Sequence, residues 1–305
     1  ELFDLFITEL AKMNVKIFAV SGNHDSAKRI AFGSDIMHKG GVYFSHVYNG
    51  ELEKHEFEDE YGKVNIYMLP FIKPTVIKNF FEEGIITDDY NSALKAVLDR
   101  ADIDFSERNI IIAHQFVTGA QRSESEEVSV GGVDSISADL FEDFDYTALG
   151  HIHKPQALQK DKMIYAGALE PIDQNDVGQH GYVKGELKDG KAAIQWIPFA
   201  GREYIHSSVE VERSDTEGSI RKRVKQLINE YGNENIYKIT LAGKRDPDIA
   251  FEVNHLAEEG CVLEILDETI PAYDFEKLYA ENKETLLGRY IEKFAGCEEG
   301  SVEYC

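Results

Sequence analysis

Four histidines and an asparagine directly follow short apolar segments of the chain: Asn23, His24, His114, His151 and His153. The three apolar segments cover residues 15–20, 109–113 and 146–149. Imidazole nitrogens combined with an amide oxygen suit manganese, iron or zinc better than calcium. Two such ions ~3.5–4 Å apart could hold the attacking and leaving oxygens of a phosphoryl displacement. These residue types therefore predict a transition-metal site suited to phosphate chemistry.

The three apolar segments have the pattern of strands buried on both faces of a sheet. Helical patterns at about 27–38 and 90–103 lie between them, and this alternation predicts an α/β fold. In open α/β sheets, ligands bind beyond the carboxyl ends of the strands. We therefore expect the three motifs to meet at one edge of the sheet.

The pattern changes after about residue 163. Segments 163–166, 181–187 and 191–197 look like antiparallel hairpins. A smaller α+β unit is predicted from about residue 201 to 270, and the remaining residues, 271–305, have helical character. The acidic segment 51–60 is expected to be a solvated loop or the tip of a hairpin.

The composition limits the class of protein. The 305 residues carry 32 basic and 56 acidic side chains, a formal net charge of −24, which argues against a stand-alone tight polyanion binder. We find no apolar segment that approaches the ~20 residues of a membrane span. The three cysteines match no paired metal spacing and indicate free thiols of a cytoplasmic protein. The chain begins at Glu1 without a methionine, so we expect a fragment.

The motifs resemble those of the calcineurin-like metallophosphoesterases, and their context is similar to the Mre11/SbcD-type nucleases. The matching segments are Gly22 to Ser34, Thr118 to Glu126 and Ala148 to Gln156. The resemblance covers about residues 1–200, while Gly167 to Pro171 and the C-terminal part look more like related bacterial DNA-repair exonucleases. It implies a sandwich of two β-sheets flanked by helices, followed by a small α+β capping domain.

The resemblance also implies roles for individual residues. Asn23, His114 and His151 would bind a second metal ion and His153 the first, with two Mn²⁺ (or Mg²⁺ or Fe²⁺) in the complete family site. His24 would donate a proton to the leaving oxygen or stabilise charge on the phosphate. Asp25 would orient His24, or would instead cap the helix that begins at Ser26.

One departure from the family pattern affects the expected activity. The family carries an Asp-x-His element and a Gly-Asp-x-x-Asp element before Gly-Asn-His-Asp, and neither occurs in residues 1–21. We therefore expect an N-terminally truncated chain with at most one well-formed metal site and little or no nuclease activity on its own. The domains would then be residues 1–200, the metallophosphoesterase domain without its first motifs, 201–270, the capping domain, and 271–305, a helical tail.

Basic residues are expected near the site and in the second unit. Lys28, Arg29, Arg122 and Lys154 would surround the metal site, where DNA phosphate would lie. The second cluster would be a basic helix start in the capping domain: Arg221, Lys222, Arg223 and Lys225. A solvated helix face explains that cluster equally well.

The resemblance predicts a metal-dependent DNA exonuclease or endonuclease in repair and recombination. An SbcC/Rad50-like ATPase would bind the C-terminal helical segment, and the family also forms homodimers. Two alternatives stay open at this point. One is a phosphoesterase acting on small phosphodiesters or nucleotides, which the second domain disfavours; the other is a non-catalytic scaffold for the ATPase. No membrane partner is expected.

Overall fold

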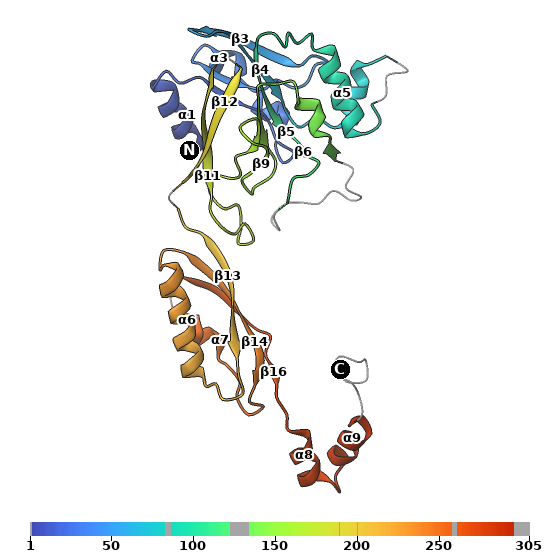
Figure 1. Cartoon of the computed structure of the whole chain (residues 1–305), viewed down its shortest axis with the longest axis vertical. Helices are drawn as coiled ribbons and strands as arrows, with labels where there is room; N and C mark the ends of the chain where they lie inside the picture. Colours follow the sequence, from blue (N-terminus) through green and yellow to red (C-terminus); the bar gives the residue numbers. More distant parts are fainter. Residues whose placement is uncertain are drawn as a thin grey trace. The chain divides into compact units, whose positions relative to one another are not determined.

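A computed structural model describes residues 2–82, 87–122, 134–188, 190–199, 201–257 and 261–295. The chain forms two compact units, Glu1–Gly201 and Arg202–Cys305, and each combines strands with helices (Figure 1). The predicted mixed α/β character is confirmed. Among the described residues, no helix is both long and apolar enough to cross a bilayer.

A six-stranded mixed sheet is the centre of unit 1. Its order is β3-β4-β5-β8-β10-β9. The strands are β3 (Glu53–Asp59), β4 (Gly62–Leu69), β5 (Arg108–His114), β8 (Tyr146–Gly150), β10 (Met163–Tyr165) and β9 (Gln156–Gln159). The four inner strands pair in parallel, whereas β3 and β9 join the edges antiparallel. The carboxyl ends of β4, β5 and β8 therefore lie side by side.

The core of unit 1 forms between this sheet and the helix α5 (Tyr90–Arg100). Leu94 and Val97 of α5 are buried in the same cluster as Ile111 of β5 and Leu149 of β8. Asp89 caps the helix, because its side chain accepts a hydrogen bond from the backbone of Ser92, and it begins close to the predicted position. A short 3-10 helix, η2 (Ala138–Phe141), adds Phe141 to this core.

The strand before Gly-Asn-His-Asp lies outside the main sheet. β1 (Ile17–Ala19) pairs in parallel only with β2 (Val42–Phe44), and α1 (Leu2–Lys12) precedes it. All three β1 residues are half-buried, so the prediction of a strand buried on both faces is wrong. The reason is that a two-stranded sheet offers β1 one covered face. The α1 helix itself has no buried residue.

The helix predicted over 27–38 is two short helices, α2 (Ala27–Ile30) and α3 (Ser34–His38). They are separate because Gly33 has a φ of 73°, a left-handed conformation that an α-helix does not contain.

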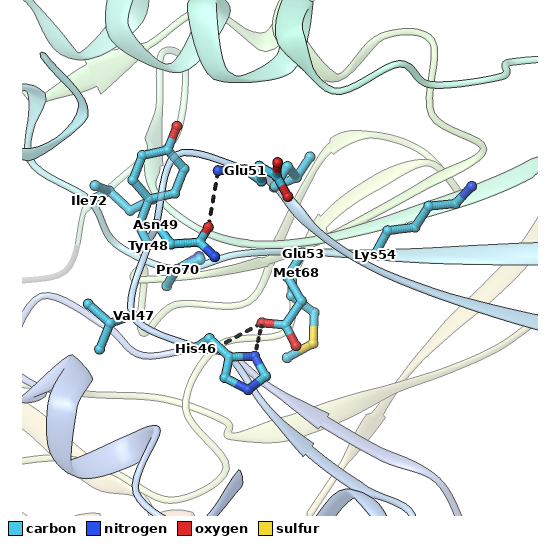
Figure 2. Close-up of a pocket in the computed structure, with 11 residues that line it drawn as sticks. His46, Val47, Tyr48, Asn49, Glu51, Glu53, Lys54, Met68, Pro70 and Ile72 are labelled. Atoms are coloured by element: carbon cyan, nitrogen blue, oxygen red, sulfur yellow. Dashed lines mark hydrogen bonds and ion pairs between the residues drawn. The ribbon is translucent and has the colours of Figure 1, made fainter. Parts of the chain in front are cut away.

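Aromatic rings and one carboxylate attach the β1–β2 sheet to β3. Tyr43 lies 4.6 Å from the ring centroids of both Phe18 and His55. Glu53 accepts hydrogen bonds from the backbone N–H of His46 at 2.9 Å and pairs with His55 Nε2 at 2.8 Å. Figure 2 shows the Glu53 carboxylate beside the His46 ring, in the wall of a pocket of about 380 Å³. The small sheet is thus held on the edge of the large one.

The acidic segment 51–60 is mainly the edge strand β3 rather than a loop. Alternate residues of β3 are exposed, as expected for a strand with one face in solvent. The expected hairpin tip is present only at its end, where Asp59 pairs with Gly62 across the turn. Asp59 also forms an ion pair with the buried Arg108 of β5.

Two further small sheets complete unit 1. β6 (Phe116–Val117) and β7 (Ser135–Ile136) pair in parallel after β5. β11 (Gly181–Lys188) and β12 (Lys191–Pro198) form the predicted antiparallel hairpin. The segment at 163 also forms an antiparallel pair as predicted, because β10 pairs antiparallel with β9; β10 in addition pairs in parallel with β8 and so belongs to the main sheet.

Unit 2 has a four-stranded sheet with helices between its strands. The strands are β13 (Tyr204–Val211), β14 (Ile236–Arg245), β15 (Val262–Asp267) and β16 (Ile270–Pro271), and all three pairings are parallel. α6 (Glu217–Tyr231) connects β13 to β14, and α7 (Val253–Leu256) precedes β15. The unit therefore has a β-α-β arrangement, since parallel neighbours need such crossovers.

Two short helices follow the sheet of unit 2. They are α8 (Phe275–Asn282) and α9 (Leu286–Phe294), which agrees with the helical character predicted for this part of the chain. The break occurs because Thr285 caps α9, accepting a hydrogen bond from the backbone of Gly288. Cys261 is a free thiol, while Cys297 and Cys305 lie outside the described residues.

We predict that Tyr165→Phe destabilises unit 1 by about 1–3 kcal/mol. The fully buried Tyr165 hydroxyl donates to Gln115 O at 2.7 Å and accepts from Val117 N–H at 2.9 Å. Loss of the hydroxyl leaves these two backbone groups, close to His114, without that hydrogen-bond partner. Denaturant unfolding followed by fluorescence of the single tryptophan, Trp196 of β12, measures the change. Tyr182→Phe, at a half-exposed ring on β11, is the control and should shift stability by less than about 0.5 kcal/mol.

Candidate metal centre

The register of the main sheet brings two of the predicted motifs together. β5 and β8 pair so that His114 lies opposite Gly150, the residue just before His151. The rings of His114 and His151 are 5.4 Å apart between centroids. Both side chains therefore leave the carboxyl edge of the sheet at neighbouring positions, as the sequence predicts.

The loop after β1 brings Asn23 to the same place. Asn23 Oδ1 lies 2.9 Å from His114 Nε2 and 3.2 Å from His151 Nδ1. The loop is anchored on both sides, because Ser21 N–H donates to Ser45 Oγ and Ser21 O accepts from Phe71 N–H. Three segments that are far apart in the sequence thus share one cluster of donor atoms.

Glycines allow this close approach. A Cβ atom on Gly22 would lie 2.6 Å from His114 Cε1, and one on Gly150 would lie 3.0 Å from His114 Nδ1. Neither space admits a side chain without moving the imidazole. The two glycines of the motifs therefore form the cradle of the His114 ring.

The backbone of His151 is in an unusual conformation. Its φ is 102°, in the left-handed region that non-glycine residues rarely occupy. Such a residue costs about 1–3 kcal/mol and is typical of sites where function requires a particular side-chain direction. The conformation turns the chain sharply after β8, so that His151 reaches Asn23.

His24 and Asp25 lie beside this cluster on its exposed side. The charges of both side chains act on His114. Asp25 Oδ2 accepts the Gly22 backbone N–H at 2.7 Å and thus closes the turn. The alternative of Asp25 as a helix cap is wrong, because Ser26 occupies the N-cap of α2. An orienting effect of Asp25 on His24 stays a prediction.

His153 faces a different carboxylate. Its Nδ1 lies 3.7 Å from Oδ2 of Asp176, a residue that is 2% exposed. Asp176 follows β10 in a long loop, and it was not predicted as a site residue because a lone aspartate in a loop carries no motif. His153 is near enough to act on the charge of His114.

The pKa of His114 is lowered to about 4, mainly by burial and with smaller contributions from the neighbouring His151, His24 and His153, while Asp25 opposes the shift. His114 is therefore neutral near pH 7. A neutral imidazole has the lone pair that a metal ion requires.

The donor set fits a single divalent ion. Two imidazoles and an amide oxygen stand within hydrogen-bond distance, and the buried His114 is neutral. Across the described ranges, no three His, Cys, Asp or Glu side chains are grouped so as to hold an ion by themselves. Asn23 is thus an essential part of any site formed by these residues.

The basic residues predicted around the site differ in their surroundings. Lys28, Arg29 and Lys154 are exposed. Arg122 is instead mostly buried: its guanidinium pairs with Asp134 at 3.0 Å and lies 3.9 Å from the ring of Phe116. The ring centroids of Phe116 and His151 are 6.3 Å apart. Arg122 therefore packs on a ring that neighbours the candidate site. Its contact with DNA stays a prediction, which this pairing does not favour.

The basic cluster of unit 2 is partly engaged within the unit. Arg223 pairs with Asp215 and donates to the carbonyl of Glu210. Arg221 donates to the carbonyl of His255, whereas Lys222 and Lys225 are exposed. The pKa of Asp215 is lowered, since Arg223 and two further hydrogen-bond donors outweigh the effect of burial. The arginines therefore stabilise α6, and the lysines present charge to solvent.

Comparison with known proteins agrees with the motifs. The chain is 29% identical to the SbcD nuclease component of SbcCD from Staphylococcus saprophyticus over 310 aligned residues, which cover 95% of this chain and 81% of that relative. No protein-family model matches the chain. The similarity extends well beyond the three motifs and confirms the predicted resemblance to the SbcD-type nucleases.

We predict that unit 1 loses stability as the pH falls from about 6.5 to 4. The folded pKa of His114, about 4, lies below the unfolded value of 6.5, so protons bind more strongly to the unfolded chain in this window. The contribution is present above the unfolded pKa and is on the order of 3 kcal/mol. Denaturant unfolding at several pH values measures the free energy of unfolding. This free energy should fall less steeply with decreasing pH in His114→Gln than in the wild type. Equal pH dependence in the two proteins would contradict the lowered pKa of His114.

A second prediction concerns the backbone of His151. His151→Gly should be more stable than His151→Ala by about 1 kcal/mol, because glycine adopts a φ of 102° without strain and alanine does not. Both variants remove the imidazole, so their difference isolates the backbone effect. A more stable alanine variant, measured by the same fluorescence unfolding, would show that His151 is not strained.

Proposed function

We propose that this chain is a metal-dependent phosphodiesterase that acts on DNA as an SbcD/Mre11-type nuclease subunit in repair and recombination. The observation that supports it most directly is the position of Asn23 Oδ1 between His114 Nε2 and His151 Nδ1, at 2.9 and 3.2 Å. The similar Staphylococcus protein is named as a nuclease, which agrees with phosphodiester chemistry. We also propose that unit 1 is the metallophosphoesterase sandwich.

The residues around the centre have separate tasks in this proposal. Asn23, His114 and His151 would hold a Mn²⁺, Mg²⁺ or Fe²⁺ ion, and His153 would belong to the other metal position that the resemblance implies. Such an ion would supply positive charge that polarises the phosphodiester. His24, which is exposed, would donate a proton to the leaving oxygen or stabilise charge on the phosphate. Lys28, Arg29 and Lys154 would bind the DNA backbone.

The donor set limits the number of ions. The site would hold at most one ion, because among the described residues no three His, Cys, Asp or Glu side chains are grouped to hold even one ion without Asn23. A symmetric clamp on the attacking and leaving oxygens needs two ions. We therefore propose that the chain alone has little or no nuclease activity.

The net charge shapes how DNA would be bound. At −24, the chain repels polyanions at long range, so contacts would be confined to a few exposed lysines and arginines. Few phosphate contacts mean weak affinity and a shallow dependence on salt. Additional affinity would come from a partner.

We propose an SbcC/Rad50-like ATPase as that partner, bound through α8 and α9. The relative's name describes one component of a larger SbcCD complex. Leu286, Leu287 and Tyr290 of α9 are 86%, 47% and 63% exposed, whereas Ile291 is buried against its own unit. This division leaves an apolar face for the coiled-coil base of an ATPase. Exposed apolar residues on α1, including Phe3 and Phe6, would suit a homodimer.

Metal titration tests the site. The wild type should bind no more than one Mn²⁺ per chain, measured by calorimetry, and Asn23→Ala and His114→Gln should each weaken binding at least about tenfold. His206→Gln, which removes a histidine from unit 2, is the matched control and should bind as the wild type does. Two equivalent ions, or unchanged affinity in both site variants, would contradict the proposed centre.

A competition assay tests the substrate class. Fluorescence anisotropy should show Mn²⁺-dependent binding of duplex DNA at low salt, which a dinucleotide diester displaces only at large excess. Equal affinity for the dinucleotide would favour a small-phosphodiester enzyme, and Mn²⁺-independent DNA binding without cleavage would favour a scaffold. Robust Mn²⁺-dependent cleavage by the chain alone would contradict the single-ion proposal.

A further inference from the structure

We propose that His46 and its carboxylate partners form a pH-sensitive latch that joins α3, β2 and β3 and so controls how firmly the Asn23 loop is held. The His46 imidazole lies between two carboxylates, those of Glu53 and Asp35. Its Nδ1 lies 3.1 Å from Glu53 Oε2, and its Nε2 lies 3.3 Å from Asp35 Oδ1. The inference goes beyond the proposed function, because it concerns the stability of one loop with or without a metal ion.

Glu53 connects the His46 ring to a second imidazole on its own strand. The same Oε2 atom accepts the backbone N–H of His46 at 2.9 Å, and Oε1 lies 2.8 Å from His55 Nε2. Figure 2 shows the carboxylate turned toward the His46 ring. The side chains of Glu53 and His55 are 18% and 13% exposed, so little water competes with these contacts. The latch is therefore a chain of alternating carboxylates and imidazoles: Asp35, His46, Glu53 and His55.

Two carboxylates around one ring favour the charged form of His46. A neutral imidazole has a proton on only one nitrogen, so the lone pair of the other nitrogen would face a carboxylate oxygen. The imidazolium has a proton on each nitrogen and is attracted on both sides. Partial burial lowers the pKa of His46, but the contacts with Glu53 and then with Asp35 outweigh burial and raise it above 6.5. The latch therefore weakens as the pH rises through this pKa.

Neighbouring titratable groups are paired with other groups, packed on rings or exposed. His38 of α3 packs against an aromatic ring of β2 and the imidazole of β3, with centroid distances of 4.4 and 5.4 Å. Lys54 of β3 pairs with Glu56 at 3.1 Å, and Lys16, before β1, lies 4.9 Å from the centroid of an aromatic ring of β3. Glu51 is exposed. The residues that β4 and the segment after it add to the wall of the pocket are uncharged: Met68, Pro70 and Ile72. The two carboxylates of the latch therefore set the charge of the ring.

The latch lies next to the contacts that hold the Asn23 loop. Ser45, the neighbour of His46, accepts the Ser21 backbone N–H through its Oγ at 3.2 Å. The backbone N–H of Ser45 donates to Ala19 O, at the end of β1, at 2.9 Å. Movement of His46 away from β3 would therefore disturb both bonds at the start of the loop. We expect the loop to be held most firmly at pH values below the pKa of His46.

The first readout is the pKa of His46, measured by NMR of its Cε1–Hε1 signal in protein without metal or DNA. We expect a value above 6.5 in the wild type. Glu53→Gln keeps the shape of the side chain and removes its charge, so it should lower the pKa of His46 by about 0.5–1. Glu51→Gln makes the same change at an exposed position two residues away and is the matched control, which should leave the pKa unchanged.

Hydrogen exchange of residues 17–24 is the second readout and reports on the loop itself. Between about pH 6 and 8.5 His114 stays neutral, so its titration does not contribute. After correction for intrinsic rates, exchange in the wild type should increase about two- to fivefold across this range, as expected for loss of a partly exposed ion pair. His46→Gln should show no such increase, whereas His206→Gln, in unit 2, should behave as the wild type does.

Three results would overturn the proposal. They are a wild-type pKa of His46 at or below 6.5, an equal change in Glu51→Gln and Glu53→Gln, and loop exchange in His46→Gln that still rises with pH as in the wild type. If Glu53→Gln does not fold, Asp35→Asn decides, because that side chain is 92% exposed and its replacement leaves the core intact. Asp35→Asn should lower the pKa of His46 by a smaller amount, and an unchanged pKa would contradict the latch.

Discussion

The parallel pairing of β5 with β8 in a single register is the constraint on which the rest of the candidate centre depends. It sets His114 opposite Gly150, and the left-handed backbone of His151 then turns the second imidazole toward the first. A shift of one residue would send His114 to the other face of the sheet. Buried residues on both strands, including Ile111 and Leu149, hold this register. Core packing therefore decides where the chemistry can occur.

The third component of the centre comes from a separate small sheet. β1 pairs only with β2, so the Asn23 loop depends on how β2 is held against β3. Glu53 of β3 does this by accepting the backbone N–H of His46, just after β2, and the ring of Tyr43 on β2 packs against His55 of β3. Ser21 then links the loop to both Ser45 and Phe71. Backbone pairing of β5 with β8 thus fixes His114 and His151, whereas the position of Asn23 depends on side-chain contacts between the small sheet and β3.

Local patterns predicted β5, β8, α5, the β11–β12 hairpin and the convergence of Asn23, His114 and His151, because apolar runs and glycine turns are local signals. They did not predict that β1 leaves the main sheet, since pairing partners are set by long-range packing. The segment 51–60 was misread because its charge hid an alternating strand pattern. The contact between Asp176 and His153 was not predicted, because burial and nearness in space are not visible in a spacing of residues. Gly33, with its left-handed backbone, marks the break between α2 and α3, and the capping residue Thr285 marks the break between α8 and α9.

If the proposed function holds, the net charge of −24 means that the chain would bind DNA through a small site at the imidazole cluster rather than through a broad basic surface. The central claim is that Asn23, His114 and His151 hold one divalent ion between them. Anomalous diffraction from crystals grown with Mn²⁺ tests this most directly. We predict one manganese peak within bonding distance of these three side chains. A peak elsewhere on the chain, or none at a concentration that saturates binding in solution, would contradict it.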